Sequence, residues 1–250
     1  MSSLLDKIKK NGNCCYLFIK HELDENIKGI TCEIGIDNGN NSLGIMKGML
    51  ERNMPRVHIT IDPFGGIPYR HYENIIDIMD YDNTKKIKTR HRLAEWCKEN
   101  TYENIFFEME DIEFFKRFSD GVPYYKKDKY LLNQYAFVHY DGPHNVKDVK
   151  IEIDFFKNKT PVGGIWVFDD IEQYPHMKQL DPYIRSLGFT SIIKEKIILN
   201  GREAIGYKRT SLAGNNLVDD VKITYKLPEN CVFRNNIQNI FLIRGNIINI

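Results

Sequence analysis

The chain has 250 residues, of which 42% are hydrophobic and 12% aromatic, a composition that excludes intrinsic disorder and is sufficient for the core of one large domain. The formal net charge of +1 provides no global field to recruit nucleic acid or an anionic membrane, and the basic cluster at 85–92 is typical of a solvated face. The five cysteines are odd in number and lack zinc spacing, which indicates reduced thiols. With no secretory leader and no run of roughly 18 apolar residues, we expect a soluble, cytoplasmic protein without membrane segments.

Strand-like and helix-like segments alternate from about residue 28 onward, which predicts an α/β fold with a doubly wound sheet. Strands are predicted at 29–36, 57–62, 105–110, 136–141 and 164–170, and helices at 42–53, 112–118, 146–156 and 176–188. Gly188 is a good carboxyl cap for the last helix. Asn200 and Gly201 separate two further strands, 191–199 and 203–209, and such a pair predicts an antiparallel hairpin.

Three regions lie outside this alternation. Residues 1–27 are expected to form a helical cap over one edge of the sheet or over the mouth of the site. Residues 64–100 are longer than an ordinary loop, and we expect them to form either a substrate lid or a structural helix pair. They lie within a main domain that is predicted at 28–210. The C-terminal extension, 211–250, contains two strand-like runs at 221–227 and 240–245, which form an edge hairpin or a subunit contact.

Three carboxylates follow apolar runs that read as neighbouring buried strands. Asp141 ends the first run in HYDGPH, and Asp169 and Asp170 end the second in WVFDD. Because parallel strands emerge at one edge of the sheet, we expect these side chains to meet where ligands bind. The simpler alternative is that the pair caps the next helix while Asp141-Gly142 forms a turn. Three clustered carboxylates repel one another without a cation, which favours a Mg²⁺ or Mn²⁺ site.

A glycine-containing acidic motif, Glu33-Ile-Gly35-Ile-Asp37-Asn-Gly39, follows the first strand. Its glycines allow close approach of a ligand to the backbone, and its acidic group can accept hydrogen bonds from a ligand. The spacing is not the G-x-G-x-x-G of dinucleotide folds, which argues against an NAD-dependent enzyme. A tight strand-to-helix turn explains the same residues equally well.

Acidic residues also close the second and third strands. Asp62 occupies a position that commonly holds ribose hydroxyls, although a turn aspartate before Pro63 explains it as well. Glu110 and Asp111 stand where a polar group can meet an adenine edge.

Together these features resemble the class I S-adenosylmethionine-dependent methyltransferases over about residues 28–209. The run from Tyr135 to Asp170 is similar to the I-D-G-x-H … L-x-P-G-G-x-x-x-F-D-D signature of the metal-dependent small-molecule O-methyltransferases, which include catechol and macrolide-sugar enzymes. It departs from that pattern at Pro143 and Val162. The resemblance implies a Rossmann-like seven-stranded sheet with an antiparallel last strand, with S-adenosylmethionine as methyl donor and Mg (or Mn) as metal. It implies cofactor contacts from Glu33, Gly35, Asp37, Gly39, Asp62, Glu110 and Asp111, and metal ligands Asp141, Asp169 and Asp170.

The proton acceptor is expected at His144 or Asp141. His144 lies where catechol-type relatives carry a lysine base, and a substrate contact or a cap on the following helix are its alternatives. His139 lies within the strand and is expected to be a core residue.

The resemblance implies an O-methyltransferase that acts on a hydroxyl of a small molecule, and its sugar-modifying branch favours a sugar or nucleotide-sugar acceptor. Aromatic and polar residues at 69–72 could stack on a pyranose. The alternative is a methyltransferase-fold binding or scaffold protein without turnover. Nucleic-acid methylation is disfavoured because the chain lacks a basic face by composition. Related enzymes assemble, so we expect a homo-oligomer.

Overall fold

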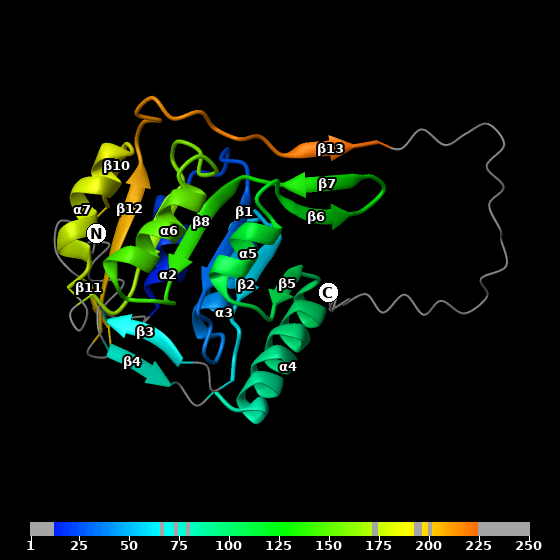
Figure 1. Cartoon of the computed structure of the whole chain (residues 1–250). Coiled ribbons are helices and arrows are strands. Elements are labelled where there is room, and N and C mark those ends of the chain that lie inside the picture. The colour runs from blue at the N-terminus through cyan, green and yellow to red at the C-terminus, as the bar shows by residue number, and fades with distance from the viewer. Residues whose placement is uncertain are drawn as a thin grey trace, which may run out of the picture.

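A computed structural model describes residues 13–65, 68–72, 75–78, 81–171, 175–192, 197–199 and 202–224. Its main sheet contains eight strands, of which seven follow one another in the order β10-β12-β9-β8-β1-β2-β5, while β11 pairs with β12 (Figure 1). The parallel strands are β1 (Ile30–Ile34), β2 (His58–Ile61), β5 (Asn104–Phe107), β8 (Tyr135–Tyr140) and β9 (Ile165–Phe168). The strand β12 (Arg202–Arg209) runs antiparallel to β9, β10 (Phe189–Ser191) and β11 (Ile197–Leu199). The predicted seven-stranded Rossmann-like arrangement with its antiparallel last strand is confirmed.

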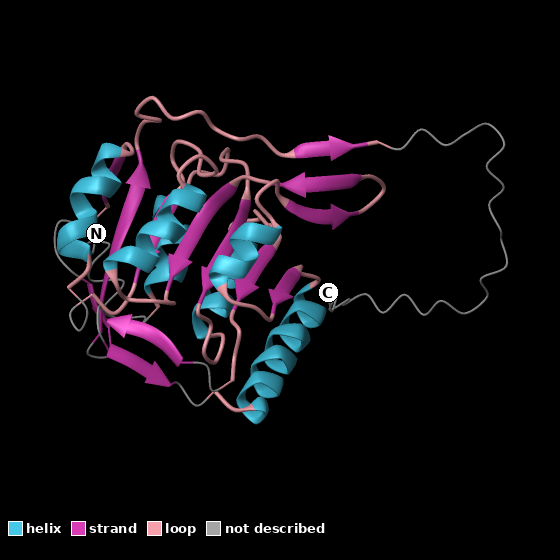
Figure 2. Cartoon of the chain, viewed as in Figure 1, coloured by secondary structure: helices cyan, strands magenta, loops and turns pink. Residues whose placement is uncertain are grey.

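Six helices are described outside the strands, and they cover both faces of the sheet (Figure 2). They are α2 (Cys14–Glu22), α3 (Asn40–Glu51), α4 (Asn83–Asn100), α5 (Asp111–Arg117), α6 (Val146–Phe156) and α7 (Met177–Ser186). Side chains of α5, α6 and α7 share one buried cluster, and those of α2, α3 and α4 share another. Alternate residues of one strand point to opposite clusters, so Trp166 packs with the first and Val167 with the second. The fully apolar runs read from the sequence are therefore strands buried on both faces.

Local signals in the sequence fix several helix ends. The side chain of Asn145 accepts a hydrogen bond from the backbone N–H of Asp148 at the start of α6, at 2.9 Å. Asp82 does the same for Lys85 at the start of α4, at 2.7 Å. After α7, Gly188 adopts a φ of 87° and its N–H donates to the carbonyl of Arg185, as expected of a carboxyl cap.

The segment at 64–100 contains a β-hairpin and one helix, and the helix pair considered from the sequence is wrong. The strands β3 (Pro68–Tyr72) and β4 (Ile75–Ile78) pair antiparallel, and Figure 1 shows them at the edge of the main sheet where the parallel strands end. The N–H of Gly65 donates a hydrogen bond to the carbonyl of Tyr81 at 2.7 Å, so the two ends of the segment that contains this hairpin lie side by side. The helix α4 is the crossover between the parallel strands β2 and β5, so it belongs to the repeating βαβ pattern.

A second, three-stranded sheet was missed by sequence analysis. The strands β6 (Val122–Tyr125) and β7 (Lys129–Leu132) form a hairpin, and β13 (Val221–Ile223) joins its β7 edge. The predicted strand at 221–227 is confirmed for its first three residues, whereas the run at 240–245 lies outside the described residues, as do residues 1–12. Within the part of the chain that is described, no helix has both the length and the apolar character needed to cross a membrane.

Candidate active site

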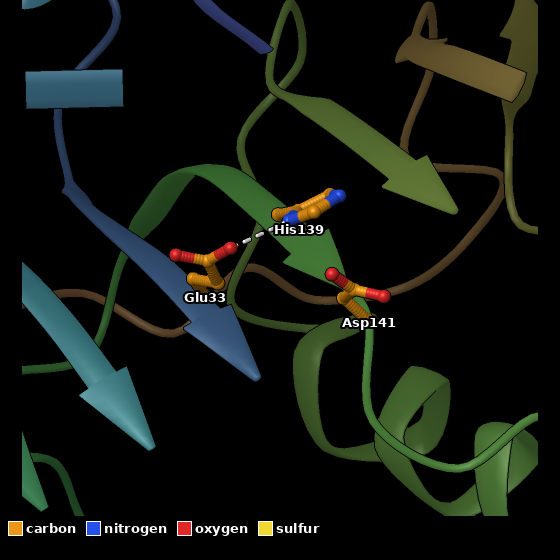
Figure 3. A group of neighbouring side chains, drawn as sticks. All are labelled: Glu33, His139 and Asp141. Atoms are coloured by element: carbon orange, nitrogen blue, oxygen red, sulfur yellow. Dashed lines mark hydrogen bonds and ion pairs between the residues drawn. The ribbon is translucent and has the colours of Figure 1, made fainter. Parts of the chain in front are cut away.

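A buried ionic chain crosses the carboxyl ends of three adjacent strands. Glu33 on β1 and His139 on β8 face each other, with 3.0 Å between Oε1 of Glu33 and Nδ1 of His139 (Figure 3). The other carboxylate oxygen of Glu33 accepts a hydrogen bond from the hydroxyl of Ser42, which lies on α3. On its far side, Nε2 of His139 lies 3.8 Å from a carboxylate oxygen of Asp169. His139 therefore connects the acidic motif after β1 to the aspartates after β9.

His139 carries a proton over the physiological pH range. Burial on its own lowers the pKa of the imidazole, but the hydrogen bond to Glu33, its charge, and the charges of Asp141 and Asp169 raise that pKa to about 10. His139 is a core residue, as expected, because it is fully buried. The sequence analysis did not predict its ion pair with Glu33. The one signal for it in the sequence is a histidine within an otherwise apolar strand.

The structure brings Asp141, His144 and Asp170 together. One potential ligand atom from each lies within 4.8 Å of the others. His144 and Asp170 are buried, and Asp170 has a φ of 52°, a left-handed conformation that turns its side chain away from the direction of β9. Burial, followed by the charge of Asp169, raises the pKa of Asp141 well above its ordinary value. A cation held by these three residues would relieve that electrostatic cost, and one nitrogen and two carboxylate oxygens suit a divalent metal.

Asp169 lies beside this group, and its expected role as a metal ligand stays a prediction. One of its carboxylate oxygens accepts a hydrogen bond from the backbone N–H of Asp170 at 3.0 Å, and the other faces His139. Among the described residues, two groups have the geometry to hold an ion: the one above, which contains His144, and a second made of Glu33, His139 and Asp141. The sequence signature treats both aspartates alike, because strand alternation alone does not fix side-chain directions in the turn that follows.

The glycine motif packs directly against the DGPH turn. Gly35 has a φ of 74°, and a Cβ at this position would lie 2.2 Å from the carbonyl oxygen of Asp141. Gly39 has a φ of 77° and precedes the first residue of α3. Gly35 therefore allows the close approach between the loops after β1 and β8, whereas a Cβ on Gly39 would meet Leu93 of α4 at 3.1 Å.

Asp37 points to α4. Its carboxylate forms an ion pair with Lys85, and its carbonyl accepts a hydrogen bond from the hydroxyl of Thr89 at 2.9 Å. Two further side chains of the basic cluster at 85–92 also have an acidic partner. The Nζ of Lys86 and the Nη1 of Arg90 lie 2.6 and 3.0 Å from the carboxylate oxygens of Glu108. The interpretation of this cluster as a largely solvated, structural face is consistent with these pairs.

Asp62 clamps the loop after β1 to the end of β2. Its Oδ2 accepts a hydrogen bond from the N–H of Ile36 at 2.9 Å, and its Oδ1 accepts one from the N–H of Phe64 at 2.8 Å. The carboxylate is buried, and burial raises its pKa, while these backbone donors lower it. Asp62 therefore has the turn role that the sequence also allowed, and its possible contact with a ribose hydroxyl stays a prediction.

The two acidic residues after β5 have different surroundings. Glu110 is exposed at the start of α5. Asp111, the first residue of that helix, is half-buried and interacts with the side chain of Glu152 on α6. Glu152 was not identified from the sequence because a glutamate inside a helix is ordinarily exposed.

Neither a comparison with models of protein families nor a search of curated proteins finds a match to this chain. Solved structures do resemble it. The calicheamicin methyltransferase CalS11 superposes with a TM-score of 0.50 at 14% identity, covering 74% of this chain and 73% of its own. An apo structure of CalS11, described as a TDP-rhamnose 3′-O-methyltransferase, gives 0.50 at 12% identity over 82% and 77%. The O-methyltransferase NovP gives 0.50 at 18% identity over 83% and 79%. The chain thus has the fold of the class I S-adenosylmethionine-dependent methyltransferases.

Proposed function

We propose that this protein is an S-adenosylmethionine-dependent O-methyltransferase that acts on a hydroxyl of a small molecule. The observation that carries the proposal is the convergence of Glu33 and the glycine loop with Asp141, His144 and Asp170 at the carboxyl edge of the sheet. In open α/β sheets this edge is where ligands bind. The fold shared with CalS11 and NovP supports methyl transfer as the chemistry.

The methyl donor is proposed to bind along the ends of β1, β2 and β5. Glu33 contributes a carboxyl group, while Gly35 and Gly39 permit contact with the backbone. Farther along the same edge lie the remaining proposed cofactor residues, which are Asp37, Asp62, Glu110 and Asp111.

Asp141, His144 and Asp170 are proposed to hold a divalent cation, with Asp169 supporting the group through the backbone of Asp170. When bound, Mg²⁺ or Mn²⁺ would lower the pKa of the acceptor hydroxyl and orient its oxygen toward the methyl group. His144 and Asp141 are also the groups placed to accept the hydroxyl proton. Methyl transfer otherwise requires in-line placement of the two substrates and exclusion of water.

A sugar or nucleotide-sugar is the acceptor class that we propose to test first. The description of CalS11 as a TDP-rhamnose 3′-O-methyltransferase supports this choice. The hairpin β3–β4 lies at the same edge as the site in Figure 1, so we propose that it acts as a lid over the acceptor.

The proposal is tested by titrating S-adenosylmethionine into the protein in a calorimeter, with Mg²⁺ and again with a chelator. The same samples are then incubated with a panel of nucleotide-sugars and analysed by mass spectrometry for a methyl adduct. We expect cofactor binding in both conditions and product only with the metal. Cofactor binding with no product from any hydroxyl acceptor would favour the scaffold alternative. No cofactor binding in either condition would reject both.

A further inference from the structure

Glu152 is a glutamate inside the protein core with no conventional partner. It lies on α6, its exposed fraction is 0%, and among the described residues no N–H or hydroxyl group donates a hydrogen bond to either of its carboxylate oxygens. Its Oε1 lies 3.4 Å from the point where a Cβ on Gly142 would stand, so the carboxyl group reaches the turn that follows β8. An ionised carboxylate in this setting would be costly, because burial without donors or cations disfavours charge.

The side chain of Asp111 is the group that Glu152 meets. The two carboxyl groups are in hydrogen-bonding contact, which requires that one of them carries a proton. On α6 and at the start of α5, Glu152 and Asp111 are also faced by Asp148 and Glu110. The thiol of Cys32 on β1 and the hydroxyl of Tyr140 on β8 face Glu152 from the sheet.

All the charged groups acting on Glu152 are acidic. Burial raises its pKa well above the ordinary value, and Asp111 and then Asp148 raise it further. For Asp111 burial also raises the pKa, but a backbone N–H and the hydrogen bond with Glu152 act in the opposite direction. The shared proton is assigned to Glu152, because a backbone N–H donates to Asp111 whereas none donates to Glu152 among the described residues.

We propose that Glu152 is a positioning residue that donates a hydrogen bond to Asp111 and holds the carboxyl group of Asp111 as an acceptor for an amine of the bound cofactor. The inference rests on the proposed function, because it takes Asp111 to face the adenine of S-adenosylmethionine at the end of β5. Glu152 does not touch the cofactor, since it is fully buried beneath the turn.

The first test is infrared spectroscopy of the unliganded protein at neutral pH. A protonated carboxyl group has a C=O stretch that is separate from the bands of ionised carboxylates. We expect this band in the wild type and a weaker band in Glu152→Gln, in which other buried acids with a raised pKa, such as Asp141, still absorb. The matched control is Glu113→Gln on α5, where the glutamate is exposed and paired with Arg117, and this variant should retain the full band. A band of unchanged intensity in Glu152→Gln would overturn the assignment of the proton.

The second test measures the dissociation constant of S-adenosylhomocysteine by calorimetry. A glutamine can still donate to Asp111, so Glu152→Gln should bind within about threefold of the wild type, whereas Glu152→Ala should bind about tenfold more weakly, the effect of one lost hydrogen bond to a charged group. Asp111→Ala should be as weak as Glu152→Ala, and the double variant no weaker. Equal binding by Glu152→Ala and Glu152→Gln, or additive losses in the double variant, would overturn the positioning role.

Failure of the two proposals can be told apart. If the wild type does not bind S-adenosylhomocysteine, the proposed function fails, and the infrared comparison still decides whether Glu152 holds the proton. If Glu152→Ala does not fold, as judged by circular dichroism, Asp111→Ala and the glutamine variant decide the question. In that case Asp111→Ala must bind about tenfold more weakly than Glu152→Gln, and equal affinity of these two variants overturns the inference.

Discussion

Glu33 and His139 form an ion pair across two neighbouring parallel strands, with 3.0 Å between Oε1 and Nδ1 and exposed side-chain fractions of 1% and 0% (Figure 3). The pair joins residues 106 positions apart in the sequence. It fixes Glu33 as a carboxylate beside the glycine loop, and it places a positive charge next to the aspartates that follow β8 and β9. A buried pair of this kind is costly to break, because removal of one partner leaves the other charge uncompensated.

Replacement of Glu33 by glutamine should release the proton of His139. Without the carboxylate, burial dominates, and the pKa of the imidazole should fall from about 10 to below its ordinary 6.5. NMR titration of the histidine ring in a chelator-treated sample measures this change. His58 is an internal reference, because burial already lowers its pKa to about 3 and the substitution should leave it neutral. An unchanged titration of His139 would mean that other carboxylates hold its proton.

The same pair should make stability depend on alkaline pH. Because the pKa of His139 is raised on folding, its contribution to the free energy of unfolding is complete below about pH 6.5 and is lost as pH rises through about 10. Denaturant unfolding of the wild type between pH 7 and 10 should show this loss, and Glu33→Gln should show a smaller one. Parallel curves for both proteins would contradict the ion pair.

The metal site can be tested by comparing neighbouring aspartates. If Asp141, His144 and Asp170 are the ligands, Asp170→Asn should weaken Mn²⁺ binding more than about 100-fold, whereas Asp169→Asn, one shell farther out, should cost about tenfold. Electron paramagnetic resonance of free Mn²⁺ measures both affinities. Equal losses would support both aspartates as ligands, as the resemblance implies, and the reverse order would exclude Asp170.

Gly35 should not tolerate a side chain. In Gly35→Ala the new Cβ would stand 2.2 Å from the carbonyl oxygen of Asp141, at a φ of 74°. We expect a loss of about 3 kcal/mol or more in the free energy of unfolding, together with loss of cofactor binding. Gly65→Ala is the matched control, because Gly65 also has a positive φ, of 91°, but outside its chain neighbours no atom of the described residues lies within 4 Å of the added Cβ. It should cost about 1 kcal/mol from backbone strain alone, and equal losses would rule out the close approach.

Asp62→Asn should destabilise the loop after β1. The amide nitrogen of asparagine cannot accept a hydrogen bond, so the N–H of Ile36 or of Phe64 would lose its buried acceptor, at a cost of about 1 to 3 kcal/mol. Asp24→Asn is the control, since Asp24 accepts from the N–H of Asn26 at the same 2.8 Å but is exposed. Thermal unfolding of both variants gives the comparison, and a similar small shift in both would show that the clamp is unimportant.

The sequence determined the fold class and most of the edge that carries the site. Apolar runs such as YAFVHY and GIWVF predicted strands buried on both faces, and Gly188 predicted the end of α7, because these signals are local or depend only on strand alternation. The hairpin β6–β7 was missed, since its two four-residue strands, VPYY and KYLL, are short and carry no clear alternation of polar and apolar residues.

Only the tertiary structure decided which side chains meet. The sequence places Asp169 and Asp170 side by side, but in the structure Asp170 joins Asp141 and His144 whereas Asp169 faces His139. Glu152 is an unremarkable helical residue in the sequence, and it becomes a buried acid because α6 packs between α5 and α7 against the sheet. Such encounters depend on chain packing over long sequence separations, which periodicity and motif spacing do not encode.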